Sequence, residues 1–261
     1  MLPSKDTPHP ILRRLIKPSV LAYTREARRL GFSWFDWLHG YVYARWTYLY
    51  ISIGTRRHPL ARWITQHLPA PQKPSPTVQP ASEPAAGKRK KLSMADTYHG
   101  KVVPLESARQ LVQVHEDVRL ENLEKIIPYP TARDIVLHNP DHIVLLDCPC
   151  RMSKENPCLP MDVCMIVGEP FASFVIEHQA GHARWITPAE ALAVLEAEDR
   201  RGHVHHAFFK DVMLERFYAI CNCCSCCCGA MQAQRNGNPM LASSGYISQV
   251  DTDLCMGCGD C

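Results

Sequence analysis

The sequence predicts a protein of mixed α+β class, in which a helical arm precedes a larger body. Two observations predict this class. The 261 residues are 46% hydrophobic and 21% charged, a composition typical of a globular protein of one domain or two small ones. In the second half of the chain, apolar residues recur partly at helical spacing and partly in short runs typical of strands.

Charge divides the chain into three regions. Residues 1–68 hold eleven basic and three acidic side chains. Residues 69–91 hold six prolines followed by a basic run, and residues 92–261 hold thirteen basic and 22 acidic side chains. Proline-rich polar segments are typical of solvated linkers. We therefore expect a basic arm at 1–68, a linker at 69–91 and an acidic body from residue 92 onward.

The arm contains nine aromatic side chains within 19 residues, between Phe32 and Tyr50. Asp36, His39 and Arg45 interrupt this stretch, so it lacks the roughly 20 consecutive apolar residues of a membrane-spanning helix. Aromatic rings beside basic side chains suit peripheral contact with an anionic membrane surface. We favour the alternative, a helical segment that packs its rings against the body or a partner subunit. Nucleic-acid binding is not expected, because no recognised motif accompanies the charge.

The first part of the body alternates between helical and strand patterns. Apolar spacing predicts a helix over 105–126, which Pro128 would stop, and a short helix over 131–139. The run from His142 to Leu146 is typical of a strand. This strand would deliver Cys148 at its end.

A second helix has clear signals at both ends. Thr187 suits the N-cap position, Pro188 the first helical position, and Glu190 completes a capping pattern, while Gly202 ends the helix. Strand-like runs follow at 203–209 and 214–220, and the second run leads into a row of cysteines. The pattern predicts an α+β body that places cysteines where its elements end.

All 13 cysteines fall between Cys148 and Cys261. The first residues contain neither an uninterrupted apolar segment nor a small-residue cleavage site, so no secretory signal is evident. We therefore expect a cytoplasmic protein, peripheral to the inner face of the membrane if the arm binds lipid. Thiols stay reduced in the cytoplasm, and clustered cysteines there are typical of metal ligands or redox groups.

Two cysteine groups lie within the body. The first group joins a Cys-Pro-Cys-Arg loop to two later cysteines, and four thiolates suffice for one tetrahedral zinc ion or one iron–sulfur cluster. Its members are Cys148, Cys150, Cys158 and Cys164. The second group places six cysteines in eight positions, so that some of them must face different sites. Its members are Cys221, Cys223, Cys224, Cys226, Cys227 and Cys228. Two to four of them are expected to bind a cluster, either alone or jointly with the first group, and spacing does not decide which.

The third group is Cys255, Cys258 and Cys261, each separated from the next by two residues. This spacing wraps one loop around a four-iron cluster, and the two intervening glycines let the backbone approach its sulfides. Together with residues 250–254, the loop resembles the first binding loop of a bacterial-type ferredoxin domain and the strand that precedes it. The resemblance implies that the three cysteines bind a [4Fe-4S] cluster with a fourth, later cysteine. We expect residues 246–261 to be the start of such a domain, and the fourth ligand is either a residue beyond Cys261, which we favour, or another cysteine of the chain.

The body also resembles a group of uncharacterised cysteine-rich iron–sulfur proteins of anaerobic organisms that end in a ferredoxin module. The similarity lies in residues 148–151, 186–191, 202–205 and 220–224. It implies a cysteine-rich α+β iron–sulfur domain over 92–245, two or more [4Fe-4S] clusters, and electron transfer with redox partner proteins.

Three histidines precede the second cysteine group on one predicted strand. Strand alternation would place His203 and His205 on one face and His206 on the other. They would either bind metal or carry protons, or form a polar strand face without a catalytic role. We find no glycine-rich nucleotide-binding fingerprint and no phosphate-binding loop.

Three functions are compatible with these patterns. The favoured one is transfer of single electrons between redox partner proteins. The second is a reductase subunit in which a cluster or redox-active thiols act on a small substrate, because cysteines outnumber the ligands of a few cubanes. The third is a zinc-binding interaction module. Whether the protein is itself an enzyme stays open, and no catalytic residue is assigned.

Overall fold

The computed structural model describes residues 17–59, 61, 63, 98–120, 135–238, 240–242 and 249–259. Helices of the arm and of the body flank a mainly antiparallel sheet, which confirms the predicted α+β class. The predicted linker at 69–91 lies outside the described residues, and so does Cys261.

The central sheet has seven strands in the order β6-β4-β5-β8-β7-β1-β9. Neighbouring strands are antiparallel except β1 and β9, which pair in parallel. The strands are β1 (Tyr98–Val102), β4 (Ile143–Asp147), β5 (Asp162–Val167), β6 (Ala183–Ile186), β7 (Val204–Lys210), β8 (Arg216–Cys223) and β9 (Leu241–Ala242). Since β5 and β8 are adjacent, they bring the first and second cysteine groups together.

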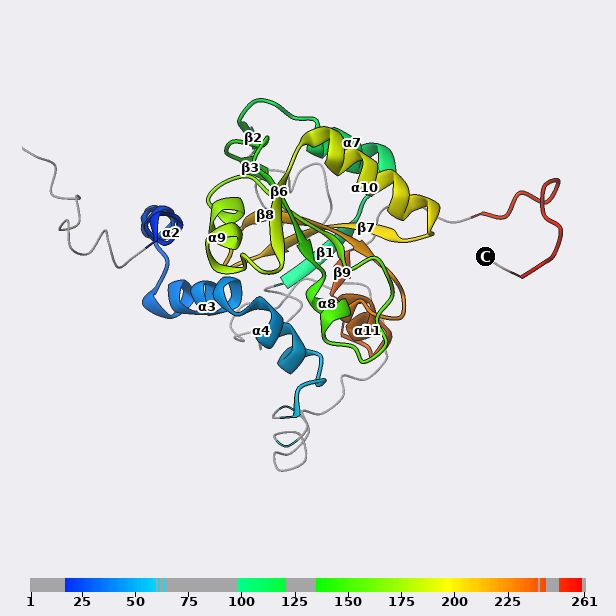
Figure 1. Cartoon of the computed structure of the whole chain (residues 1–261), viewed down its shortest axis with the longest axis horizontal. Coiled ribbons are helices and arrows are strands. Elements are labelled where there is room, and N and C mark those ends of the chain that lie inside the picture. Colours follow the sequence, from blue (N-terminus) through cyan, green and yellow to red (C-terminus); the bar gives the residue numbers. More distant parts are fainter. Residues whose placement is uncertain are drawn as a thin grey trace, which may run out of the picture.

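Helices cover both faces of the sheet (Figure 1). On one face, arm helices and α9 pack over a core that includes Val144, Ile166 and Ala219. On the other face, α7 and α10 pack over Leu145, Met165 and neighbouring residues. Alternate residues of each strand point to opposite faces, which explains the division. The helices are α2 (Pro18–Arg29), α3 (Trp34–Arg45), α4 (Thr47–Gly54), α7 (Leu105–Val112), α8 (Pro149–Met152), α9 (Phe171–His178), α10 (Pro188–Arg200) and α11 (Gly229–Arg235).

The structure confirms the predicted helix after Thr187. Its side-chain oxygen accepts a hydrogen bond from the backbone N–H of Glu190 at 3.2 Å, and Gly202 follows the helix with a φ of +71°. A positive φ suits glycine, which has no Cβ to clash with the backbone. Sequence signals at both ends therefore located α10 correctly.

Two other helix predictions are wrong where the structure describes them. The helix over 105–126 ends at Val112, and Val118–Leu120 forms strand β2. Ile135–Leu137 forms strand β3, in place of the short helix predicted over 131–139. The two strands pair antiparallel, and β-branched residues favour this extended conformation.

The arm packs against the body instead of standing free of it. Tyr23 donates a hydrogen bond to the carbonyl of Val212 at 2.7 Å, and Glu26 forms an ion pair with Arg216 at 3.0 Å. The hydroxyls of Tyr43 and Tyr218 lie 2.6 Å apart. Many of the aromatic rings therefore pack against the body, as the packed-helix interpretation of this stretch predicts.

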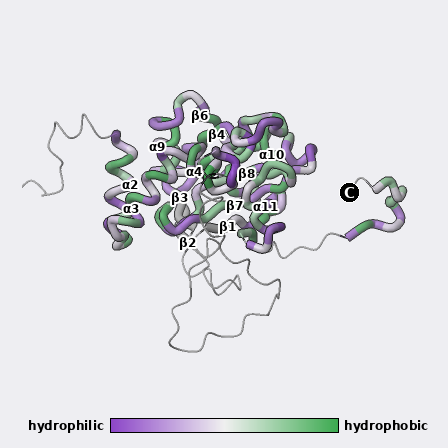
Figure 2. The backbone as a smooth tube through the Cα atoms, turned by 90° about the horizontal axis from the view of Figure 1, so that it is seen from below, coloured by the Kyte–Doolittle hydropathy of each residue, from purple (hydrophilic) through white to green (hydrophobic). Residues whose placement is uncertain are grey.

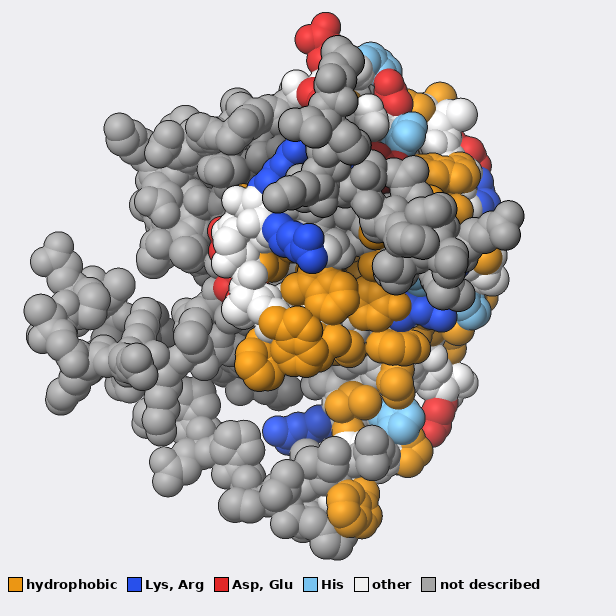
Figure 3. All heavy atoms as spheres, turned by 90° about the vertical axis from the view of Figure 1, so that its left-hand side faces the viewer, with side chains coloured by type: hydrophobic (Ala, Val, Ile, Leu, Met, Phe, Trp, Pro, Cys, Tyr) orange, Lys and Arg blue, Asp and Glu red, His pale blue; other side chains and the backbone are white. Residues whose placement is uncertain are grey.

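Other apolar side chains of the arm stay exposed. Trp34 is 63% exposed and Phe35 is 76% exposed. Figure 3 shows hydrophobic side chains gathered in a band on this side of the molecule, with Lys and Arg nearby. No helix in the described ranges is long and apolar enough to cross a membrane. Peripheral contact with a lipid surface stays a prediction.

Cys255 and Cys258 of the third cysteine group lie apart from the body. Residues 249–259 stand away from the sheet in both views (Figures 1 and 2), and Cys255 and Cys258 are exposed. Residues 252–254 form a turn, so this described segment contains no strand before the predicted loop. No strand among the described residues pairs with it, so it lacks the hydrogen bonds that the expected strand would need.

Candidate metal centre

Four cysteines form a group that we call the outer set: Cys158, Cys224, Cys226 and Cys227. Cys158 lies on the loop between α8 and β5, and the other three lie between β8 and α11. Their Sγ atoms all lie within 4.8 Å of one another. The Sγ atoms of Cys158 and Cys226 are 2.8 Å apart, and those of Cys226 and Cys227 are 3.7 Å apart.

This spacing fits a single metal ion. Thiolates at about 2.3 Å from one tetrahedral ion stand about 3.8 Å from each other. Cys226 is exposed while Cys224 and Cys227 are buried, so the outer set lies at the surface of the body. The chain therefore has a group of four cysteines that could hold a metal ion.

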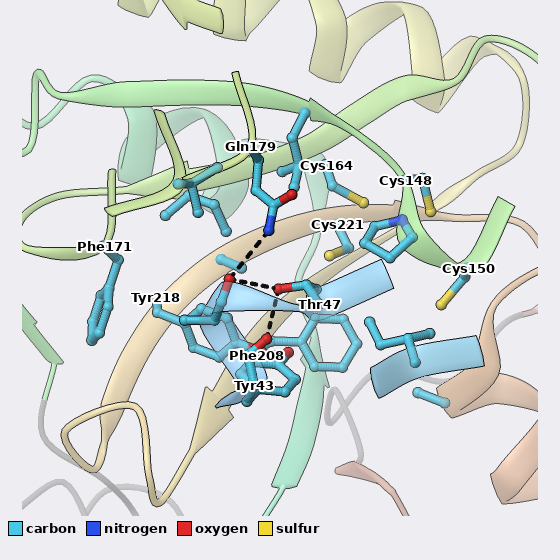
Figure 4. Close-up of a pocket in the computed structure, with 18 of the residues that line it drawn as sticks. Tyr43, Thr47, Cys148, Cys150, Cys164, Phe171, Gln179, Phe208, Tyr218 and Cys221 are labelled. Carbon is cyan, nitrogen blue, oxygen red and sulfur yellow. Dashed lines mark hydrogen bonds between the residues drawn. The ribbon is translucent and has the colours of Figure 1, made fainter. Parts of the chain in front are cut away.

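Six further cysteines form what we call the inner set: Cys148, Cys150, Cys164, Cys221, Cys223 and Cys228. They line a cavity of about 90 Å³ between the sheet and the arm, which Cys224 and Cys227 of the outer set also line. The Cys148 thiol contacts those of Cys150 and Cys164, and Cys164 also contacts Cys221. Cys223 contacts Cys228. Figure 4 shows the first four sulfurs gathered toward one end of the cavity, away from Phe171.

The sets in space differ from the groups in sequence. Cys158 belongs to the first group in the sequence, but its Sγ atom lies with those of three cysteines of the second group. Conversely, Cys164 on β5 lies opposite Cys221 on β8 in the antiparallel register. Adjacent residues such as Cys223 and Cys224 belong to different sets, in keeping with the expectation that some of these cysteines face different sites.

Hydrogen-bond donors favour the thiolate form at selected cysteines. The thiols of Cys150 and Cys164, and then backbone N–H groups of α8, hold the pKa of Cys148 well below its usual range despite burial. The Cys223 thiol, with backbone N–H groups at the start of α11, lowers the pKa of Cys228 in the same way. Donors stabilise the charged form. Thiolates are also the form that binds metal.

Arg151 is a buried cation beside both sets. Its side chain is fully buried, lines the cavity, and donates from Nη2 to Glu198 at 3.2 Å and to the carbonyl of Asn222 at 3.3 Å. Burial alone would lower its pKa, but the nearby thiols of Cys224 and Cys148 raise it overall. Its Nε has no hydrogen-bond partner among the described residues. This donor can stabilise negative charge at either set.

The arm holds the cysteine loops together through Arg57. Its guanidinium donates to the carbonyl of Cys150 at 2.8 Å and to the carbonyl of Cys227 at 3.1 Å. The same group donates to the side chains of Ser153 and Gln232 at 2.7 and 2.9 Å. One residue therefore connects α8, which carries inner cysteines, to the loop of the outer set. The sequence does not indicate this role, because Arg57 is one of many basic residues in the arm.

Close packing of the arm continues at Gly229. A Cβ there would come within 2.8 Å of the Thr55 side chain. The backbone N–H of Gly229 donates to the Sγ of Cys150 at 3.4 Å. A glycine at this position therefore lets the arm and α11 pack closely beside the inner set. In the fold, α4, α8 and α11 lie together at one end of the sheet (Figure 1).

The three histidines take different environments. His203 contacts Glu198 at 2.6 Å, and His205 contacts Asn222 at 2.6 Å. His206 is fully buried, and its register partner on β8 is Cys221. Burial lowers the pKa of His206 to about 4. The ring is therefore neutral at pH 7, and it lies on the sheet face that carries the inner cysteines.

Searches of family models, curated proteins and solved structures find no match to this chain. The ability of the clustered cysteines to hold a metal is a property of the structure. The resemblances to ferredoxin domains and to anaerobe iron–sulfur proteins stay expectations from the sequence.

Proposed function

We propose that the protein is an iron–sulfur protein that transfers single electrons between a donor protein and an acceptor protein. The observation that supports this most is the convergence of ten thiols at one end of the sheet, eight of them lining one cavity. A packed core gains little from so many small thiols, whereas iron–sulfur clusters need thiolates as ligands.

The residues around the cavity suit a polynuclear iron–sulfur centre. When bound, a [4Fe-4S] cluster accepts one electron from a donor and passes one electron to an acceptor. Tyr43, Thr47 and Ile51 line the cavity on the arm side. Arg151 and the N–H group of Gly229 supply positive charge and a donor to sulfur. Both favour the reduced, more negative state and so raise the reduction potential.

Electrons would enter or leave near the outer set. Cys226 is exposed, Leu159 next to Cys158 in the chain is 70% exposed, and Met152 on α8 is 41% exposed. Exposed apolar side chains on the segments that carry the cysteines suit transient docking of a partner protein, which would exchange electrons with the inner centre. A [4Fe-4S] cluster on Cys255, Cys258 and Cys261 would form a further centre, as the ferredoxin resemblance implies.

A redox titration followed by electron paramagnetic resonance tests this function on protein purified without oxygen. We expect a signal that appears with one electron per centre and disappears reversibly on reoxidation. Complete absence of such a signal across the accessible range, in protein that contains its metal, would overturn electron transfer.

A zinc-binding interaction module is the second candidate. The Sγ atoms of the outer set all lie within 4.8 Å of one another, and this spacing favours a zinc site. Four thiolates so close together suit one tetrahedral ion better than a cubane, which places four irons between its ligands. Zinc without acid-labile sulfide in the purified protein would support this candidate. Equal amounts of iron and sulfide would count against it.

A further inference from the structure

The two cysteine sets differ in how their sulfurs are spaced. The outer Sγ atoms converge on one point, all within 4.8 Å of one another. The inner thiols touch only in a row and a pair, from Cys150 through Cys148 and Cys164 to Cys221, and from Cys223 to Cys228. In the described part of the chain, no three inner thiols converge as the outer ones do.

This difference separates two kinds of metal centre. A single ion draws its four thiolates to one point. A cluster of several irons and sulfides stands between its thiolates, which therefore surround a space. The six inner thiols line the cavity of about 90 Å³, together with Cys224 and Cys227 of the outer set, and six thiols exceed the four that a cubane needs.

Arg151 gives a second, independent indication of the kind of ligand that the cavity binds. Its guanidinium is fully buried and lines the cavity, and its Nε lacks a partner among the described residues. A buried donor without a partner costs free energy unless an acceptor reaches it. Sulfides and thiolates of an iron–sulfur cluster carry negative charge and accept hydrogen bonds, so such a cluster would supply the missing acceptor.

We infer that the body holds two different centres: a polynuclear iron–sulfur cluster at the inner set and a single tetrahedral zinc ion at the outer set. The inner assignment rests on the proposed function, whereas the outer assignment does not. The pairs Cys223–Cys224 and Cys227–Cys228 each join the two sets through one peptide bond. The zinc ion therefore fixes the loop that presents inner cysteines, and its role is structural.

Cysteine-to-serine variants of the full chain, purified without oxygen, test this division. Zinc, iron and acid-labile sulfide are measured per chain. Cys158→Ser and Cys226→Ser, which change the outer set, are expected to lose zinc and keep most of their iron and sulfide. Cys164→Ser and Cys150→Ser, which change the inner set, are expected to lose about four irons and four sulfides and keep zinc.

Two controls make the test specific. Ser225→Ala changes an exposed residue between two outer cysteines and should keep all three components. Cys150 lies at α8 and is only partly buried, so its variant gives an inner result if Cys164→Ser fails to fold. Circular dichroism identifies any variant that does not fold.

The outcomes separate the two proposals. Loss of iron and sulfide in equal proportion from outer and inner variants would overturn the division into two kinds of centre and leave the iron–sulfur function standing. Absence of iron and sulfide from the unmodified chain, with zinc present and lost in the outer variants, would overturn the proposed function and the inner assignment together.

Discussion

Cys164 and Cys221 lie directly opposite each other on the adjacent antiparallel strands β5 and β8. Their positions in the sequence place them in different cysteine groups, yet the register turns both toward the cavity side of the sheet. This pairing joins the two groups into one inner set. Metal binding at this end of the molecule therefore depends on long-range strand pairing as well as on local loops.

Removing Arg57 should loosen both cysteine loops. Its guanidinium makes four hydrogen bonds that connect the α8 region to the loop before α11. Since such charge-assisted bonds contribute about 1.5–3 kcal/mol each at most and share one group, we expect Arg57→Ala to lower the free energy of unfolding by about 2 kcal/mol. Chemical denaturation measures the change.

The matched control for Arg57 is its neighbour. Arg56 is exposed, so Arg56→Ala should change stability by less than about 0.5 kcal/mol. Metal retention should fall in Arg57→Ala alone. Equal effects of both variants would show that arm charge in general matters, and not the specific contacts of Arg57.

Replacing Arg151 should change the redox behaviour of the inner centre. Arg151→Gln removes a buried positive charge next to thiols of both sets, so we expect a more negative reduction potential, because the reduced centre loses a stabilising cation. The variant also leaves Glu198 without one of its cationic partners.

Arg201→Gln is the control for the Glu198 effect. Arg201 also contacts Glu198, at 2.8 Å, but its side chain is 46% exposed. This control should destabilise the protein slightly and leave the potential unchanged. A potential that does not move in Arg151→Gln would refute an electrostatic role for this residue.

Stability should depend on pH through His206. Burial lowers its folded pKa to about 4, below the ordinary value of 6.5. Between these values the unfolded chain binds a proton that the folded chain does not, so stability falls as pH falls from 6.5 toward 4. The full loss is about 3 kcal/mol.

Urea unfolding at pH 7 and pH 5 checks this expectation. The chain should lose more stability over this interval than His206→Gln, which has no proton to bind. An identical pH dependence in both proteins would mean that His206 contributes nothing to it and that the thiols or carboxylates account for the change.

The arm should bind anionic vesicles if its exposed rings and cations contact lipid. Trp34→Ser combined with Phe35→Ser should weaken co-sedimentation with anionic vesicles, since these side chains are 63% and 76% exposed. Trp185→Ser, which changes a Trp that is 45% exposed on β6, is the control. Equal binding to neutral and anionic vesicles, or none to either, would rule out the predicted contact.

Local signals predicted part of the fold well. Thr187, Pro188 and Gly202 located α10, because caps act within a few residues. The helix over 105–126 failed beyond Val112, since spacing alone could not reveal that Val118–Leu120 pairs with Ile135–Leu137. Tertiary pairing decides such ambiguous segments.

The sequence predicts which cysteines form the candidate site, but not how they divide into an outer and an inner set. Cysteine density pointed to every member of both sets. Cys158 joins the outer set through the path of a loop, and Cys221 joins the inner set through the β5–β8 register, and neither is encoded in spacing. Arg57 and Gly229 act through contacts between the arm and the body, which no local pattern could indicate.

The most direct measurement of the central claim is the content of iron, acid-labile sulfide and zinc in the full chain purified without oxygen. The account predicts iron and sulfide in equal amounts, about four of each for the inner set, together with about one zinc. A cluster on the third cysteine group would add about four more of each. Zinc without sulfide would contradict the iron–sulfur function and leave a structural zinc module.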